Sequence, residues 1–283
     1  MKELCSEIIG KALELGADCA GIASIGDLKR MPSFRMMPLR PHIDRVGAVP
    51  NETGLPEGVV AWPDGMRSVL IIACSHPEED PILDCWLDEK NPPGNVLLAS
   101  IIRRVKAWLD LAHPEISSIP MGYYVERGGI WLKDAAAMAG LGVIGKNNLL
   151  VTPEYGSRVR LRAMYLSMDA PSTGPLAWDP CAGCSEPCRA ACPQGAFSER
   201  VYSPDDYNGL QALPGRSGCY DLCKCDLQMA ADEAAIQKGE ITLPGYGTFH
   251  SVLPYCRACE FGCIVGRKPS IQDQSIQDQS IRD

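Results

Sequence analysis

The sequence predicts a three-layer α/β domain that is followed by a smaller cysteine-rich domain. Two observations support this prediction. Helix-like and strand-like apolar patterns alternate through residues 1–175, whereas ten of the 14 cysteines crowd into the segment from Cys181 to Cys263. Hydrophobic residues make up 46% of the 283 residues and charged residues 22%, which is the usual composition of a folded globular chain.

The elements of the first domain follow from apolar periodicity. Helical spacing of Leu, Ile and Ala predicts helices at residues 4–15, 96–111 and 131–139. Apolar runs predict strands at 20–23, 68–75 and 122–126, and a hairpin of 148–152 with 159–168. Helices that alternate with strands in this way pack on both faces of one sheet. Residues 30–64 carry six prolines and little periodicity, so we expect a long irregular segment of the kind that covers ligands.

The composition changes at residues 171–180, where Pro, Gly and Ser dominate, and we place the domain boundary there. The domains are then residues 1–175 and 176–268. Residues 269–283 repeat a short polar unit and are predicted to be a disordered tail. Within the second domain Ser203 and Pro204 begin a short helix, and a longer helix at 226–238 ends at Gly239.

The surface chemistry excludes some classes of partner. No apolar run reaches the roughly 20 residues that cross a bilayer, and the N-terminal MKELCSEIIGKALELG is amphipathic and unlike a secretory signal. We therefore expect a cytoplasmic protein with no membrane partner. A formal net charge of -8 would repel a phosphate backbone, so nucleic acid is not an expected partner. In a reducing compartment, clustered thiols indicate metal ligation and not disulfides.

The strongest motif is CAGCSEPCRAACP, in which Cys181, Cys184, Cys188 and Cys192 precede Pro193. Four thiolates that converge on the iron corners hold a [4Fe-4S] cluster, and short spacings let the backbone wrap around it. In two-cluster ferredoxins the fourth cysteine of such a run serves the other cluster. This chain has one extra residue before Cys188, which alters the spacing and removes no ligand.

A second run, YCRACEFGC, supplies three more thiols. The crossed arrangement then predicts two [4Fe-4S] clusters in a bacterial ferredoxin-like domain. One cluster would be held by Cys181, Cys184, Cys188 and Cys263, and the other by Cys192, Cys219, Cys256 and Cys259. Cys219 is one choice of eighth ligand, with Cys223 and Cys225 as alternates. A zinc site is the minor alternative, because the close pairs lie far beyond the spacing of a zinc ribbon. The remaining thiols, Cys5, Cys19, Cys74 and Cys85, lie in apolar patterns and should pack in the core.

Together with these cysteines, the segment AGLGVIGKNNLLVTPEYGS resembles the AGLGWxGKxxLL segment of the epoxyqueuosine reductases. Those are cobalamin-dependent iron-sulfur reductases akin to the catalytic part of reductive dehalogenases. The similarity covers roughly residues 2–268. Gly140, Gly142, Gly145 and Lys146 match the pattern, and the resemblance implies that they bind the cofactor, because a glycine turn lets backbone approach a large ligand. The alternative is a tight turn with a surface lysine.

The family also carries an acid ahead of the helix that leads into this turn. Counted back from AGLG without gaps, Glu126 falls where family members have a proton-donating Asp. The resemblance therefore implies that Glu126 is the catalytic acid, with the carboxyl moved outward by one methylene. The alternative is a surface carboxylate paired with Arg127.

These inferences predict an anaerobic oxidoreductase in which two [4Fe-4S] clusters pass electrons to a corrinoid that reduces a small substrate. Its partners would be that substrate and a redox protein of the ferredoxin or flavodoxin type. One alternative is a ferredoxin-like electron carrier, or an activator of a partner protein, without a corrinoid. A flavin in the cleft of the α/β domain is a third. Full-length epoxyqueuosine reductases continue into a helical-repeat region that helps hold tRNA. This sequence ends soon after the second cysteine run, so tRNA is not the expected substrate.

Overall fold

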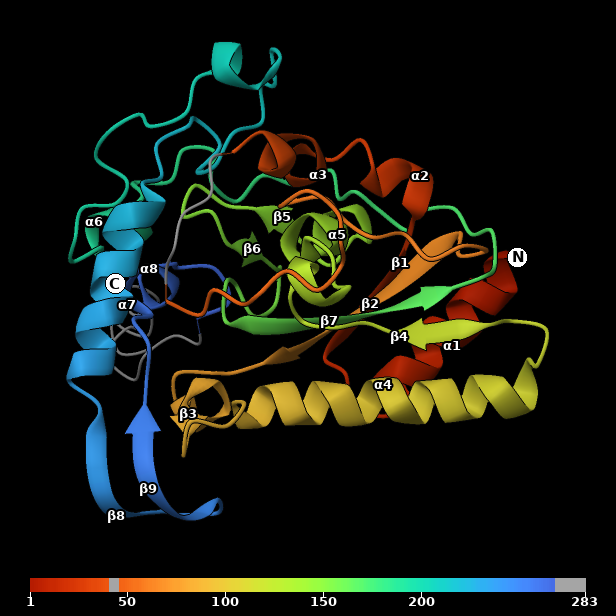
Figure 1. Ribbon diagram of the computed structural model, residues 1–283, viewed down its shortest axis with the longest axis horizontal. Helices are drawn as coiled ribbons and strands as arrows, with labels where there is room; N and C mark the ends of the chain where they lie inside the picture. The colour runs from red at the N-terminus through yellow and green to blue at the C-terminus, as the bar shows by residue number, and fades with distance from the viewer. Residues whose placement is uncertain (41–45, 268–283) are drawn as a thin grey trace, which may run out of the picture.

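A four-stranded antiparallel sheet forms the centre of the molecule. The computed structural model describes residues 1–40 and 46–267. The sheet has the order β1-β2-β7-β4, as Figure 1 shows. Its strands are β1 (Cys19–Ser24), β2 (Ser68–Ser75), β7 (Val159–Leu166) and β4 (Ser118–Pro120), and each neighbouring pair is antiparallel.

The two faces of the sheet are both buried, which confirms the three layers predicted from the sequence. In β2 the side chains of Val69 and Ile71 enter one core, and those of Leu70 and Ile72 enter the other. Side chains that alternate along a strand reach opposite faces, so an all-apolar strand needs cover on both sides. The helices α1 (Lys2–Glu14) and α4 (Pro93–Ala112) cover one face, and α2 (Ile25–Leu28) and α5 (Leu132–Met138) cover the other.

Two predictions about strands are wrong. The chain at 122–126 forms a tight turn that leads into a short 3-10 helix, η3 (Val125–Arg127). Gly122 packs so closely there that a Cβ would lie 2.3 Å from the carbonyl oxygen of Arg127. The predicted hairpin of 148–152 with 159–168 does not form either, because β6 (Leu150–Val151) pairs with β5 (Val143–Ile144) while β7 pairs with β2 and β4.

The cysteine-rich part contains short helices and a hairpin that the sequence did not predict. Its helical elements are α6 (Pro187–Ala190), η4 (Pro204–Tyr207), α7 (Leu222–Ala234) and α8 (Ala258–Phe261). Ser203 caps η4 by accepting a hydrogen bond from the Asp205 amide, which confirms the predicted helix start. The predicted helix at 226–238 begins and ends earlier, and Gly239 lies in β8 (Gln237–Leu243). That strand pairs with β9 (Gly247–Leu253), and β9 pairs with β3 (Trp86–Leu87) of the first domain.

The predicted irregular segment at 30–64 forms only short helical turns where the structure describes it, namely α3 (Pro32–Met36) and η1 (Met37–Leu39). The predicted tail at 269–283 lies outside the described residues. Within residues 1–40 and 46–267, no helix combines the length and the apolar character that a bilayer crossing requires.

Candidate functional site

The first group of thiols gathers where α6 lies against α8. Burial and neighbouring thiolates raise the pKa of Cys188 to about 11. The thiolates that contribute are those of Cys263, Cys181 and Cys184. The backbones approach closely here, because a Cβ on Gly262 would lie 2.7 Å from the Cys188 Cα. The structure therefore brings together the four thiols of the first predicted set.

The second group of thiols lies around the start of α7 and the start of α8. Burial, followed by the charges of nearby groups, raises the pKa of Cys259 to about 12, and Cys225 and Cys256 contribute most among those groups. Cys225 and Cys192 also raise the pKa of Cys256, after burial and Asp232. The second group in the structure is therefore Cys192, Cys225, Cys256 and Cys259.

Cys225, the alternate eighth ligand, is among the main causes of the raised pKa values of Cys256 and Cys259, whereas the predicted Cys219 is not. A hydrogen bond from Ser217 and the Arg189 guanidinium are the main causes that lower the pKa of Cys219. Cys225 instead lies in the first turn of α7, whose N-terminus is capped by the Asp221 side chain through the amides of residues 223 and 224. The sequence shows three cysteines near one helix start, and only the rotation of that helix decides which of them faces Cys192.

Side chains of the α/β domain hold the backbone that carries the last cysteines. Buried Arg158 donates to the carbonyl oxygens of Cys263 and Val265, at 3.2 and 2.6 Å. Two further buried side chains make similar bonds, Asn147 to the carbonyl of Cys259 and Ser157 to the carbonyl of residue 260. Buried carbonyl groups need such partners. The α/β domain thus positions one ligand candidate of each thiol group.

A cavity of about 810 Å³ lies between the α/β domain and the cysteine-rich part. This volume is in the upper range of pockets that hold small molecules and cofactors. Its walls come from segments far apart in the sequence, among them α3, η3, α5, the start of β7 and the loop before α7. Four of its lining residues carry large aromatic rings, namely Tyr123, Tyr124, Trp131 and Tyr220.

Glu126 lines this cavity, as the resemblance implied. Arg127 forms an ion pair with Glu52 at 3.0 Å, so the alternative pairing of Glu126 with Arg127 is not formed. Among the described residues, the Glu126 carboxylate has no hydrogen-bond or ion-pair partner. A carboxylate that borders a cavity without a structural partner is available to a molecule inside it.

The glycine turn does not contact the cavity. Gly140, Gly142, Gly145 and Lys146 are absent from its lining, whereas their neighbours Ile144, Asn148 and Leu149 contribute to it. A Cβ on Gly142 would lie 2.2 Å from the carbonyl oxygen of Val151, so this glycine is needed for the β5-β6 pairing itself. Lys146 pairs with Glu186 at 2.6 Å, and this contact raises the pKa of Lys146. The turn therefore supports the residues that line the cavity without lining it itself.

The second thiol group adjoins the cavity through Tyr220 and Lys133. Burial raises the pKa of Cys225, while a hydrogen bond from Tyr220 and the Lys133 charge lower it. Both Tyr220 and Lys133 line the cavity. Of the two thiol groups, the group with Cys225 thus shares residues with the cavity wall.

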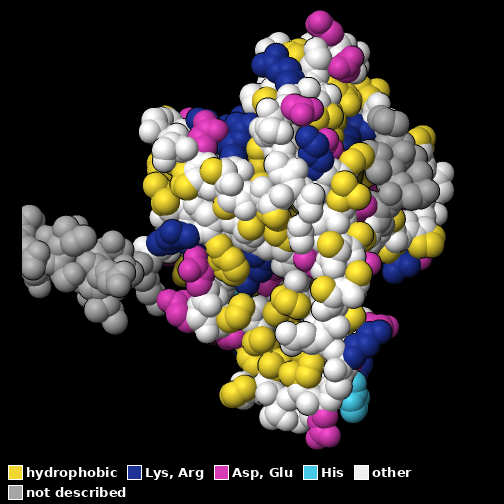
Figure 2. Space-filling view, turned by 90° about the vertical axis from the view of Figure 1, so that its left-hand side faces the viewer, with side chains coloured by type: hydrophobic (Ala, Val, Ile, Leu, Met, Phe, Trp, Pro, Cys, Tyr) yellow, Lys and Arg dark blue, Asp and Glu magenta, His cyan; other side chains and the backbone are white. Residues whose placement is uncertain are grey.

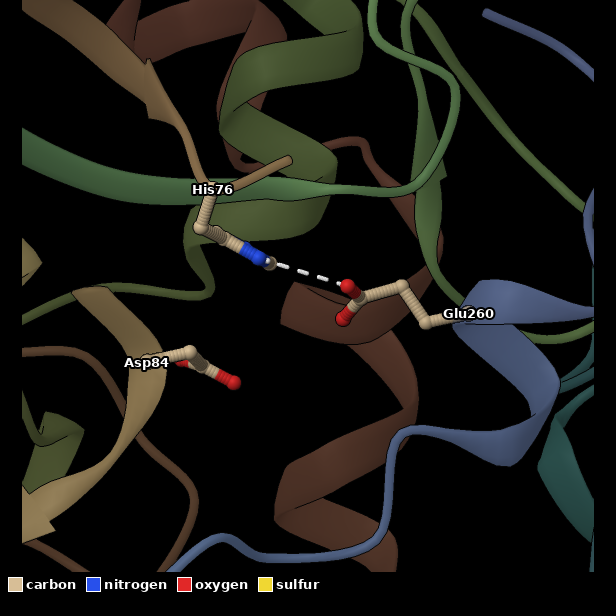
Figure 3. Close-up of side chains that lie close together, drawn as sticks. All are labelled: His76, Asp84 and Glu260. Carbon is tan, nitrogen blue, oxygen red and sulfur yellow. Dashed lines mark ion pairs between the residues drawn. The ribbon is translucent and has the colours of Figure 1, made fainter. Parts of the chain in front are cut away.

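Two sets of buried polar side chains at the cavity were not predicted. Asp134 on α5 accepts a hydrogen bond from the Ser33 amide at 2.5 Å. A second set consists of His76, Asp84 and Glu260. His76 follows the end of β2, Asp84 lies in the turn before β3, and Glu260 lies on α8, and the three side chains point toward one another in Figure 3. These residues are separated by up to 184 positions in the chain (260 − 76). No local motif in the sequence could have joined them.

Comparison with known proteins gives relatives of one kind, although no family model matches the chain. The chain is 33% identical over 140 residues to an epoxyqueuosine reductase of Gloeobacter violaceus, a match that spans 48% of this chain and 42% of that protein. It is 25% identical over 200 residues to the enzyme of Leadbetterella byssophila, spanning 70% of this chain and 66% of that protein. The matches thus cover less than two thirds of these relatives' length.

Solved structures show the same fold. The epoxyqueuosine reductase of Bacillus subtilis, solved with its catalytic loop swung out of the active site, superposes with a TM-score of 0.56 at 20% identity over 94% of this chain and 66% of that one. A reductive dehalogenase, described as supporting a mechanism for B12-dependent dehalogenation, gives 0.54 at 16% identity over 97% of this chain and 34% of that one. The chain is distantly homologous to epoxyqueuosine reductases, and its structure is similar to that of reductive dehalogenases.

Proposed function

From this homology and from the thiol groups beside the cavity, we propose that the chain is an iron-sulfur reductase. Two [4Fe-4S] clusters would pass electrons to a corrinoid in the cavity, and a small substrate would be reduced there. The observation that carries the proposal is the contact of Tyr220 with both Cys225 and the cavity. An electron on the cluster that the second thiol group would hold could then pass directly to the cavity wall.

The thiol groups fit two clusters. Each group contains four cysteines, which is the ligand number of a [4Fe-4S] cluster. The first would use Cys181, Cys184, Cys188 and Cys263, and the second would use Cys192, Cys225, Cys256 and Cys259. Ligation requires thiolates, and burial raises the pKa of Cys188 and Cys259, so assembly would release protons from them.

The cavity fits a large cofactor with an apolar body. Its volume and aromatic lining suit a broad ring system, and apolar side chains such as Met31, Met36 and Leu213 line it together with polar ones. A bound corrinoid would supply the reducing chemistry, since cofactors carry the steps that side chains cannot perform. The side chains of this chain would hold the ring, exclude water and supply a proton, and we assign the proton to the Glu126 carboxyl group.

Retention of cobalamin by anaerobic, cluster-loaded protein tests the proposal. After desalting, about one cobalt per chain should remain, as expected for one cavity. Ala212 lines the cavity from an exposed loop, so Ala212→Trp should block it and lower retention. Ala230→Trp, on the exposed face of α7, is the matched control and should retain cobalt. No retention by the wild type would favour the electron-carrier alternative.

The role of Glu126 has its own test. Glu126→Gln preserves shape and removes the transferable proton, so the variant should retain cobalamin like the wild type and lose turnover. Loss of retention would make Glu126 a binding residue and would remove its assignment as the acid.

We propose a small molecule as the substrate and not tRNA. The net charge is -8, and Figure 2 shows Lys and Arg interspersed with Asp and Glu on the face that carries α7 and the β8-β9 hairpin. A uniformly basic surface, which would attract phosphates, is not present on that face. Binding of tRNA should therefore be weak at moderate salt. Tight, salt-dependent binding in a filter assay would contradict this assignment.

A further inference from the structure

A buried polar group lies on the wall of the cavity. His76 is only 2% exposed, and its Nδ1 atom lies 3.3 Å from Oε1 of Glu260. Ligand atoms of His76, Asp84 and Glu260 all lie within 4.8 Å of one another, as a cation site would require. All three residues line the cavity. A set of one imidazole and two carboxylates is typical of a metal site.

Two guanidinium groups already neutralise the carboxylates. Arg160 pairs with Asp84. Arg257 donates from Nε to Oε1 of Glu260 at 2.9 Å, and the same Nε lies 3.5 Å from Oδ2 of Asp84. Two positive and two negative groups therefore balance. A divalent cation would add uncompensated charge in a buried place, which is unfavourable.

The contacts of Arg257 also fix the hydrogen-bonding role of His76. Nη2 of Arg257 contacts Nδ1 of His76 and donates to the His76 carbonyl oxygen at 2.9 Å. A guanidinium only donates, so Nδ1 is assigned as the acceptor, and the neutral ring then carries its proton on Nε2. Among the described residues Nε2 has no partner, which leaves this N–H available to the cavity.

Arg160 supplies a second donor on the same wall. Its Nε donates to Oδ1 of Asn95 at 2.9 Å, and its Nη1 pairs with Asp84. Its Nη2 has no partner within the part of the chain that the structure describes. Both fixed contacts hold in place the guanidinium of Arg160, which lines the cavity, so its remaining donor is preorganised.

We infer that His76 and Arg160 form a subsite that binds the oxygen atom of a neutral polar group, such as a carboxamide or a ketone. A neutral group fits because the charges of the wall are already balanced. Both Arg257 contacts go to Oε1 of Glu260, and its Oε2, which accepts no hydrogen bond from residues 1–40 and 46–267, would repel an anion. That the bound molecule is the substrate rests on the proposed function. The subsite itself does not require a corrinoid.

Three probes of similar shape test the subsite in the cluster-loaded full chain without cobalamin. Benzamide offers a neutral oxygen, benzoate an anionic one and toluene none. Ligand-observed NMR in sealed anaerobic tubes should give an affinity for benzamide about tenfold higher than for benzoate or toluene, which is the scale of one hydrogen bond to a charged group. Because cobalamin is absent, failure of the corrinoid proposal would not change this outcome.

Substitution of His76 assigns the effect to this wall. His76→Phe should lower benzamide affinity about tenfold and leave toluene binding unchanged, and retained toluene binding shows that the cavity is intact. His76→Gln keeps an N–H donor, so its benzamide affinity should lie between those of the wild type and of His76→Phe. If His76→Phe does not fold, the comparison of His76→Gln with the wild type still tests the subsite. His250→Phe on exposed β9 is the matched control. Benzoate binding tighter than benzamide would overturn the inference. So would Mn²⁺ binding, detected by electron paramagnetic resonance, that His76→Phe abolishes.

Discussion

Asp134 illustrates how single residues link the fold to the cavity. It lies on α5, it is buried, and burial raises its pKa, while the hydrogen bonds from Ser33 oppose that rise. Its Oδ2 accepts from the Ser33 amide in the first turn of α3, so the carboxyl joins two elements that wall the cavity. The sequence placed this residue in a helix and gave no sign of its burial beside a proline-rich segment.

The raised pKa of Asp134 predicts a pH-dependent contribution to stability. Folding favours the protonated carboxyl, so its contribution is complete below the ordinary pKa and is lost as the pH rises through the raised folded value. An Asn is neutral throughout. Asp134→Asn should therefore gain stability relative to the wild type as the pH rises above the ordinary aspartate pKa of about 4. Anaerobic thermal midpoints of both proteins would show this, and a gap that widens in the wild type's favour at high pH would contradict it.

The glycine turn was predicted from the sequence, but its role was not. Its match to a known pattern suggested contact with a cofactor, whereas Gly142 is required because the β5-β6 backbone occupies the space of a Cβ. A pattern of glycines shows where a side chain is not tolerated. It does not show whether a ligand or the chain itself fills the space.

Alanine substitutions can test this structural role. Gly142→Ala should lower the thermal midpoint, because a Cβ 2.2 Å from the Val151 carbonyl forces β5 and β6 apart. Gly10→Ala is the matched control, since its Cβ meets nothing within 4 Å on exposed α1, and Ala should stabilise that helix by about 0.5–1 kcal/mol. Equal midpoints for the two variants would show that the turn tolerates a side chain.

At the scale of elements, prediction succeeded where one segment carries its own pattern. The run SVLIIACS gave β2 with its bounds, and α1 and α4 differ from expectation by a few residues. Prediction failed where the structure of a segment depends on a partner far away in the sequence. The hairpin β8-β9 packs Ile241 and Phe249 against a small cluster that contains Cys85 and Leu87, which lie more than 150 positions earlier (241 − 87 = 154). The choice between Cys219 and Cys225 was open for the same reason, because it depends on thiols that lie far away in the sequence.

Arg158, which directly precedes β7, holds the segment that follows α8. Arg158→Met would leave the carbonyls of Cys263 and Val265 without donors, and the free energy of unfolding should fall by about 2–3 kcal/mol. Visible absorbance of the clusters should then decay faster in air. Arg103→Met, on the exposed side of α4, is the control and should keep the wild-type lifetime. Equal lifetimes for both variants would show that Arg158 does not position the cysteine segment.

At the scale of the molecule, the α/β domain and the cysteine-rich part build the cavity together. The α/β domain supplies most of the wall, and the cysteine-rich part closes it with the loop before α7 and with Glu260. The same contacts hold the cysteines, so cofactor site and cluster site share one framework. The order that we propose for electrons follows from it, from the Cys188 group to the Cys225 group and then past Tyr220 to the cavity.

Iron and acid-labile sulfide, measured per chain after anaerobic reconstitution, test the central claim most directly. The wild type and Cys219→Ser should each hold about eight of both, because two clusters need four thiolates each and Cys219 serves neither. Cys225→Ser should fall to about four, since one cluster loses a ligand. About one zinc per chain without sulfide in the wild type, or a loss in Cys219→Ser with none in Cys225→Ser, would contradict the account.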